Sequence, residues 1–215
     1  MPDTPSKQKS LIFLSLLCFS LADVRDGLGP FLGVYLQSLG WMPDEIGFVM
    51  TAGGLAGLVC TTPLGALADH TRYKRGLIAT SVLLIVVACG MIFSWNGAAA
   101  VTFSKILSCT AAAAIMPALT GITLGMVGQR GLPTRLGTNE AWSHAGNAVT
   151  AILGGVIGYT SGIPGVFFVM ALMGGMALFC LWGIAPRHID YAVARGLNPD
   201  SIGHAALKSK KLYPL

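Results

Sequence analysis

The sequence predicts an all-α integral membrane protein with six transmembrane helices and both termini in the cytoplasm. Hydrophobic residues make up 53% of the 215 residues and charged residues only 11%, whereas soluble domains carry about 25% charged residues. The mean hydropathy is +0.68. The apolar residues gather in long runs, and most bases lie between these runs. Length, apolar composition and the placement of the bases therefore agree on a multi-pass membrane bundle.

Six apolar runs are each long enough to cross a bilayer, which takes about 20 residues. The first run could contain a signal peptide, because residues 11–22 have the length of its apolar region and end in the small-x-small pattern Ser20-Leu21-Ala22. The apolar character resumes at Gly27, however, which favours an uncleaved span. We expect a cytoplasmic N-terminus at 1–10, a six-span domain at 11–185 and a basic cytoplasmic tail at 186–215. The expected spans are 11–36, 46–68, 77–95, 99–127, 139–159 and 165–184.

The distribution of Lys and Arg predicts the orientation of the bundle. Bases near the ends of membrane helices are retained on the cytoplasmic side. With six spans, 12 of the 14 bases fall in segments on one side, and none falls in the three loops on the other side. The two remaining bases, Arg25 and Lys105, lie inside spans. The twelve are Lys7, Lys9, Arg72, Lys74, Arg75, Arg130, Arg135, Arg187, Arg195, Lys208, Lys210 and Lys211.

Charged residues inside the predicted spans are candidates for a functional site, because each costs about 2.5–3.5 kcal/mol in hydrocarbon. They occur in the first, fourth and fifth spans, which we expect to face water. The charge-free third and sixth spans are expected to face lipid. On the first span, the helical period places Asp23, Asp26, Gly27, Pro30 and Gln37 on one stripe, where Gly27 and Pro30 weaken the helix. The candidate site residues are Asp23, Arg25, Asp26, Gln37, Lys105, Glu140, His144 and Asn147.

Two alternatives stay open for these charges. Arg25 could neutralise Asp23 and Asp26, so that the three only fix the helix against a neighbour. Lys105, expected about 9 Å deep by helix rise, could extend its ammonium group to the outer headgroups instead of meeting Asp23. Glu140 and His144 have the i, i+4 spacing of metal ligands, but no third ligand is nearby, so we expect no metal.

A short cationic turn, GALADHTRYKRGL at 65–77, separates the second and third spans. Its G-x-L-A-D stretch and following bases resemble the loop between the second and third spans of the major facilitator superfamily. His70, Arg72 and Tyr73 depart from the family pattern. The segment from Lys105 to Pro117 is similar to the fourth-span signature of proton-coupled members, which usually have Arg and Gly where this chain has Lys105 and Cys109.

The resemblance implies a fold and a function. It implies the N-terminal six-helix half of such a transporter, built as a 3+3 repeat, and a secondary active, proton-coupled transport or efflux of a small molecule without a cofactor. It places the protein in the plasma membrane, with a bacterial inner membrane favoured. It also implies a partner, either a second six-helix half or another copy of the chain. The turn would act as a conformational gate through Gly65, Asp69, Arg72, Lys74 and Arg75.

Other functions find less support in the sequence. A nucleic-acid partner is disfavoured because the bases lie in the loops. An enzyme is disfavoured because the chain shows no nucleophile–base pair, phosphate-binding loop or metal cluster. The alternative to a transporter is a non-transporting interaction subunit, or a membrane-embedded enzyme using Asp23, Asp26, Glu140 and His144. The sequence leaves open the substrate, the direction of transport and whether the chain is a fragment, a split half or a homodimer.

Overall fold

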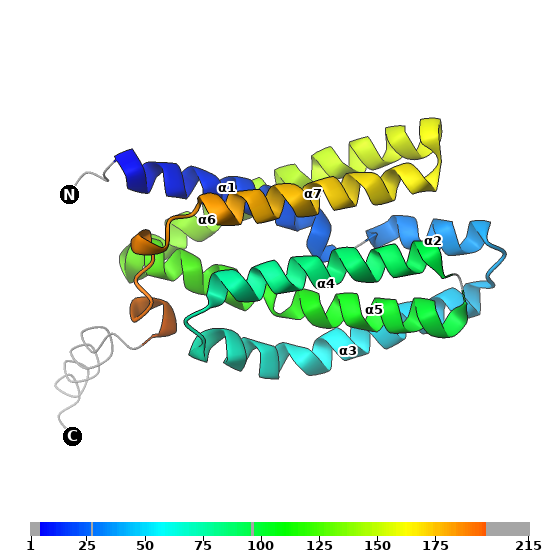
Figure 1. Ribbon diagram of the computed structural model, residues 1–215, viewed down its shortest axis with the longest axis horizontal. Coiled ribbons are helices and arrows are strands. Elements are labelled where there is room, and N and C mark those ends of the chain that lie inside the picture. The colour runs from blue at the N-terminus through cyan, green and yellow to red at the C-terminus, as the bar shows by residue number, and fades with distance from the viewer. Residues whose placement is uncertain (1–4, 27, 96, 197–215) are drawn as a thin grey trace, which may run out of the picture.

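A computed structural model describes residues 5–26, 28–95 and 97–196, and this part of the chain contains helices and no strand. Figure 1 shows the long helices lying side by side along the long axis. The start of α1, the α3–α4 turn and the end of α7 lie together at one end, which we call the basic end. The helices are α1 (Pro5–Asp26), α2 (Gly29–Ser38), α3 (Pro43–His70), α4 (Lys74–Ser94), α5 (Ala98–Ala113), α6 (Ile115–Ser161) and α7 (Ile163–Gly183), followed by the 3-10 turns η1 (Pro186–His188) and η2 (Val193–Arg195).

The second, third and sixth predicted spans correspond to α3, α4 and α7 within a few residues. In the described part of the chain, four segments are long and apolar enough to cross a membrane, and the third of them is the 64-residue segment Ala98–Ser161. A straight helix of that length would measure about 96 Å, three times the hydrocarbon core of about 30 Å. The chain instead turns back within it (Figure 1). The protein is therefore a multi-pass membrane protein, and the count of six crossings stays a prediction.

The reversal within α6 occurs at Gly128, which has φ 69° and ψ 176°. Only glycine adopts this backbone conformation without strain. The sequence predicted a ten-residue loop, GQRGLPTRLG at 128–137, and this was wrong, because the helix resumes directly after Gly128. The restarted helix is tied to α1, since the Arg135 side chain donates hydrogen bonds to the Leu11 carbonyl (2.7 Å) and to the Ser15 hydroxyl (2.8 Å).

The first predicted span is divided into α1, with 22 residues, and α2, with 10. The structure confirms the predicted interruption: Gly29 has a φ of +46°, and Pro30 occupies the first turn of α2, where a proline disturbs the helix least. Gly27 lies outside the described residues. α1 packs on α6 and α7, and α2 contacts α3 and α7.

The core forms where helices with small residues approach closely. α1 packs mainly on α6 and α7, and α5 packs between α3 and α4. The α1–α6 contact is so close that a Cβ atom at Gly146 would lie 2.1 Å from the Phe19 carbonyl oxygen. A glycine that lets two helix backbones approach so closely is a usual basis of helix association in membranes. Large apolar side chains such as Leu14, Leu17, Ile85 and Ile122 fill the remaining space.

The helices differ in how much of each is buried. In their most apolar stretches, α4 and α7 bury 39% and 44% of the residues. Both keep large apolar side chains such as Leu83 and Phe168 exposed, so the expectation that they face lipid stays a prediction. The corresponding stretch of α3 is only 11% buried. The reason is position, because α4 and α7 each contact several helices, whereas α3 packs chiefly on α5 along one side.

Candidate functional site

Polar side chains from α1 and α6 meet at the interruption of the first predicted span. They surround a cavity of about 270 Å³. Bulk water occupies about 30 Å³ per molecule, so the cavity has room for several waters or a small polar group. Three predicted site residues converge here, from positions more than 120 residues apart. The lining consists of Asp23, Asp26, Leu28, Gly29, Phe31, Asn147, Thr150 and Ala151.

The two carboxylates of this site have different surroundings. The Asp26 side chain is 57% exposed and pairs with Arg25, whose Nε lies 3.8 Å from Oδ1 of Asp26. Asp23 is partly buried, and its Oδ2 is fully buried without a hydrogen-bond partner among the described residues. A buried carboxylate oxygen without a partner is costly, and a proton, a water or a cationic group would satisfy it. Arg25 thus pairs with Asp26 and leaves Asp23 without an ion-pair partner among the described residues.

The α6 side of the cavity presents an amide and a hydroxyl. Asn147 is partly buried, and Thr150 is buried with its hydroxyl donating to the Gly146 carbonyl at 2.9 Å. Ser143 donates to the Cys18 carbonyl at 3.4 Å, which ties this part of α6 to α1. Thr150 was missed by the sequence reasoning. It could have been found, because it lies three residues after Asn147 and so shares its helical face.

The other predicted site residues do not line this cavity. Glu140 and His144 are exposed on α6, and Gln37 is exposed near the end of α2. Lys105, on α5, is partly buried, and its Cγ lies so near α3 that a Cβ at Gly53 would be 2.7 Å away. Lys105 forms no ion pair with any carboxylate of the described residues. Its pairing with Asp23 therefore stays a prediction. The described residues also contain no group of three or more metal-ligating side chains.

The turn between α3 and α4 is held by two of its bases. Lys74 is fully buried, and its Nζ donates to the carbonyls of Ala68 and Asp69 at the end of α3. Arg75 donates from Nε and Nη2 to the Leu181 carbonyl (3.2 and 2.9 Å), at the end of α7. The last carbonyls of a helix lack partners within the helix, so each base satisfies a helix end and joins two helices. Of the other predicted gate residues, Gly65 is partly buried, and Asp69 and Arg72 are exposed.

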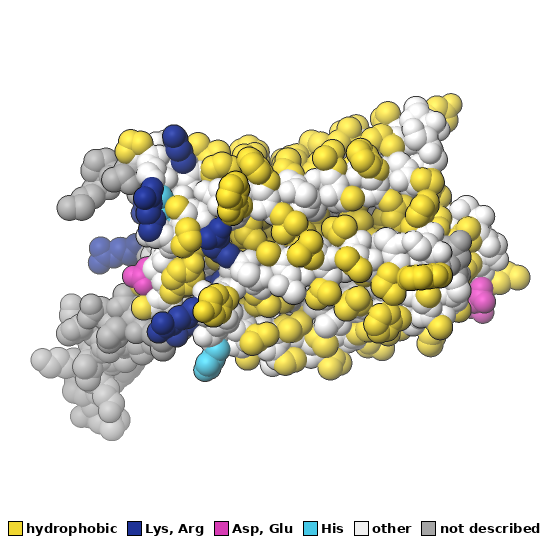
Figure 2. Space-filling model, in the orientation of Figure 1, with side chains coloured by type: hydrophobic (Ala, Val, Ile, Leu, Met, Phe, Trp, Pro, Cys, Tyr) yellow, Lys and Arg dark blue, Asp and Glu magenta, His cyan; other side chains and the backbone are white. Residues whose placement is uncertain are grey.

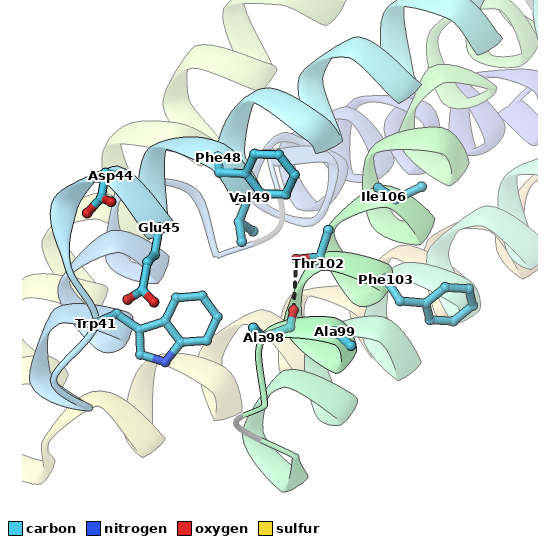
Figure 3. Close-up of a pocket in the computed structure, with 10 residues that line it drawn as sticks. All are labelled: Trp41, Asp44, Glu45, Phe48, Val49, Ala98, Ala99, Thr102, Phe103 and Ile106. Atoms are coloured by element: carbon cyan, nitrogen blue, oxygen red, sulfur yellow. Dashed lines mark hydrogen bonds between the residues drawn. The ribbon is translucent and has the colours of Figure 1, made fainter.

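Another cavity, of about 800 Å³, lies at the opposite end of the bundle, between the starts of α3 and α5 (Figure 3). The sequence analysis did not predict it. Trp41, Phe48 and Phe103 make it largely apolar and aromatic, and its two carboxylates are Asp44 and Glu45. Glu45 is already engaged, because its Oε2 accepts the Met42 amide at 2.9 Å and caps α3. This cavity is open and apolar, unlike the small polar cavity at Asp23.

An all-helical, multi-pass bundle with polar side chains gathered at an interrupted helix is the architecture of a membrane transport protein. The family model of the Major Facilitator Superfamily matches residues 11–209. Two curated proteins from two strains of Mycobacterium tuberculosis, each described as an uncharacterized MFS-type transporter, are 41% identical to this chain over 186 residues. The chain belongs to the Major Facilitator Superfamily. The match covers 86% of this chain and 44% of each relative, so the chain spans a little under half of their length.

Proposed function

We propose that this chain is a six-helix half of a secondary active transporter that moves a small molecule across the inner membrane of a bacterium in exchange or symport with protons. One observation carries the proposal. Asp23 has a buried carboxylate oxygen without a hydrogen-bond partner among the described residues, at the point where the helix is interrupted and a polar cavity forms. Ionisable residues inside membrane helices are usually functional, and transporters place their sites at such interrupted helices.

The surroundings of Asp23 support a role in proton coupling. When Asp23 takes up a proton, the free-energy cost of burying its carboxyl group falls, and the cavity becomes easier to close. Loss of the proton favours a state in which water or a cationic group reaches the carboxylate. Asn147 and Thr150 supply groups that can hydrogen-bond a substrate in the same cavity. In this proposal proton binding and substrate binding share one small site.

The remaining polar residues complete the proposal. The Arg25–Asp26 ion pair keeps the local charge near neutral. Gln37, Glu140 and His144, which are exposed in this chain, contact substrate together with a second six-helix half. Lys105 supplies a positive charge to the same pathway. The α3–α4 turn acts as the gate, because Lys74 and Arg75 link the ends of α3 and α7.

The test replaces Asp23 by Asn in the chain reconstituted together with a second six-helix half. Substrate-induced charge movement is recorded on a solid-supported membrane with a panel of sugars, organic acids and organic amines. A compound that gives a signal with the unaltered protein should give at most about 1% of that signal with Asp23→Asn, as expected when a required protonation step is lost.

Asp44→Asn is the matched control, because Asp44 is an exposed carboxylate at the start of α3, away from the Asp23 cavity. It should leave charge movement unchanged. Both variants should reach the membrane at the normal level. If Asp23→Asn retains proton-coupled charge movement, or fails only because the protein no longer folds, the proposed role of Asp23 is wrong.

A further inference from the structure

A third cavity, of about 500 Å³, lies at the basic end between the first turn of α4 and the last turn of α7. It is separate from the Asp23 site, and its two arginines belong to the α3–α4 turn that is proposed above as the gate. Its lining combines two arginines, Arg72 and Arg75, with an apolar wall that includes Leu178 and Leu181. None of the residues that line it is acidic. The cavity is thus cationic on one side and apolar on the other.

Arg75 is fixed in position at this cavity. Its guanidinium donates to the Leu181 carbonyl through Nε and Nη2, and its Nη2 also lies 3.4 Å from the Trp182 carbonyl. These bonds occupy one edge of the planar group, which leaves Nη1 to donate to another acceptor. Arg72 is exposed and has no hydrogen-bond or ion-pair partner among the described residues. The cavity therefore offers one positioned charge and one adaptable charge.

Aromatic side chains stand at the rim of the same cavity. Tyr73 is 82% exposed and Trp182 is 80% exposed, and both line it. Tyr and Trp concentrate where a membrane protein meets the headgroup region. Figure 2 shows Lys and Arg side chains gathered towards this end of the molecule, directly beside exposed hydrophobic side chains. Bases beside exposed apolar and aromatic side chains are typical of the level at which lipid headgroups meet acyl chains.

We propose that this cavity binds the headgroup of an anionic phospholipid, with an acyl chain lying along the apolar wall between α4 and α7. Guanidinium groups recognise phosphate through paired hydrogen bonds. Basic pockets between helices at the cytoplasmic side are the usual form of such lipid sites. A soluble anion could bind the two arginines, but it would not contact the apolar wall or the exposed aromatic rings. A phospholipid would contact all of these groups. A bound lipid would join the start of α4 to the end of α7.

The test uses Trp182 as a reporter inside the site. In a chain with Trp41, Trp95 and Trp142 changed to Phe, Trp182 is the one tryptophan left. The protein is placed in phosphatidylcholine nanodiscs that contain a minor fraction of brominated phosphatidylglycerol or, in parallel, the same fraction of brominated phosphatidylcholine. Bromine quenches tryptophan at close range, so we expect stronger quenching by the anionic lipid. The substitution Arg72→Gln should weaken the affinity of the site for phosphatidylglycerol, relative to phosphatidylcholine, roughly fivefold.

Arg130→Gln is the matched control, because Arg130 is exposed and lies outside the residues that line the cavity. It should leave the preference unchanged. Native mass spectrometry of the chain with all four tryptophans gives a second readout, in which retained phosphatidylglycerol should fall for Arg72→Gln and not for Arg130→Gln. Equal quenching by the two lipids, or equal effects of the two variants, would refute the site. Loss of the preference on adding inorganic phosphate would show a soluble-anion site instead.

Discussion

Lys74 joins three helices through one buried side chain. Lys74 is the first residue of α4, and its ammonium group donates hydrogen bonds to the carbonyls at the end of α3. Its methylene groups lie against α6 at Gly121. A Cβ at Gly121 would come within 2.8 Å of the Lys74 side chain. Burial of a charge is tolerated here because the carbonyls supply hydrogen-bond partners. The family motif thus has a direct structural role in this chain, separate from any role in gating.

At the residue scale, the contact of Gly146 with α1 yields a stability prediction. Gly146→Ala would place a methyl group 2.1 Å from the backbone oxygen of Phe19, which cannot move without shifting α1. We expect a destabilisation of at least about 1–3 kcal/mol, the usual cost of overpacking a core. Thermal unfolding in mild detergent measures it as a lowered midpoint.

Gly155→Ala is the control for this change. Gly155 lies on the same helix, is exposed, and a Cβ there would meet no atom within 4 Å. Alanine favours helix by up to about 1 kcal/mol relative to glycine, so this variant should unfold at the same temperature or slightly higher. Equal midpoints for the two variants would contradict the close approach of α1 and α6.

At the element scale, the reversal at Gly128 can be tested directly. Gly128→Ala forces a side chain into a backbone conformation that is nearly restricted to glycine, which costs about 1–3 kcal/mol. We expect a lower unfolding midpoint and faster proteolysis near the reversal. Gly137→Ala, farther along α6 with no atom within 4 Å of the added Cβ, should have neither effect. An unchanged midpoint for Gly128→Ala would show that the helix does not reverse there.

The helices were predictable to different degrees. Spans α3, α4 and α7 were found within a few residues, because each is one apolar run with a polar turn or a glycine at its ends. The break near residue 28 was predictable from its glycines and proline. The helix after Gly128 was missed, since local propensity favours a loop where Gly131, Pro133 and Gly137 cluster. Contacts of Arg135 with α1 hold that segment, and a sequence pattern does not show such contacts.

The candidate site was predictable in part for the same reason. Helical periodicity placed Asp23 and Asp26 on one stripe, and the fold brings them to one cavity with Asn147 of another helix, while their role in transport stays a prediction. Periodicity says which side chains share a face but not which faces meet. The exposed Glu140 and the Lys105 side chain packed against Gly53 were therefore assigned to the same site without evidence of contact.

At the scale of the whole molecule, exposed faces predict a partner. Polar Glu140 and His144 are exposed on α6, and α3 is the least buried of the four apolar segments. Lipid contact with these polar groups would be costly. We therefore expect the purified chain to form a dimer or a complex with a second six-helix half, covering faces of α3 and α6.

Mass measurement in nanodiscs tests this expectation. The chain alone should show a mass of two copies, and co-expression with a second half should replace it by a one-to-one complex. Glu140→Leu together with His144→Leu should increase the share of single copies, since it removes the polar groups that disfavour lipid contact. A stable single copy that transports a substrate would contradict the pairing.

Contacts between helices differ in kind along the bundle, although ring contacts such as Phe13–Phe179 also occur nearer the basic end. Near the basic end, Arg75 and Arg135 join separate helices through directional hydrogen bonds, as His188 does to Ser10 at 2.7 Å. At the opposite end, the rings of Tyr35 and Phe93 both pack against Phe167, with centroids 5.4 and 5.3 Å away. Hydrogen bonds weaken steeply when their geometry shifts, whereas ring contacts keep most of their attraction when the rings slide. We therefore expect the helices to shift relative to one another more easily at the opposite end than at the basic end.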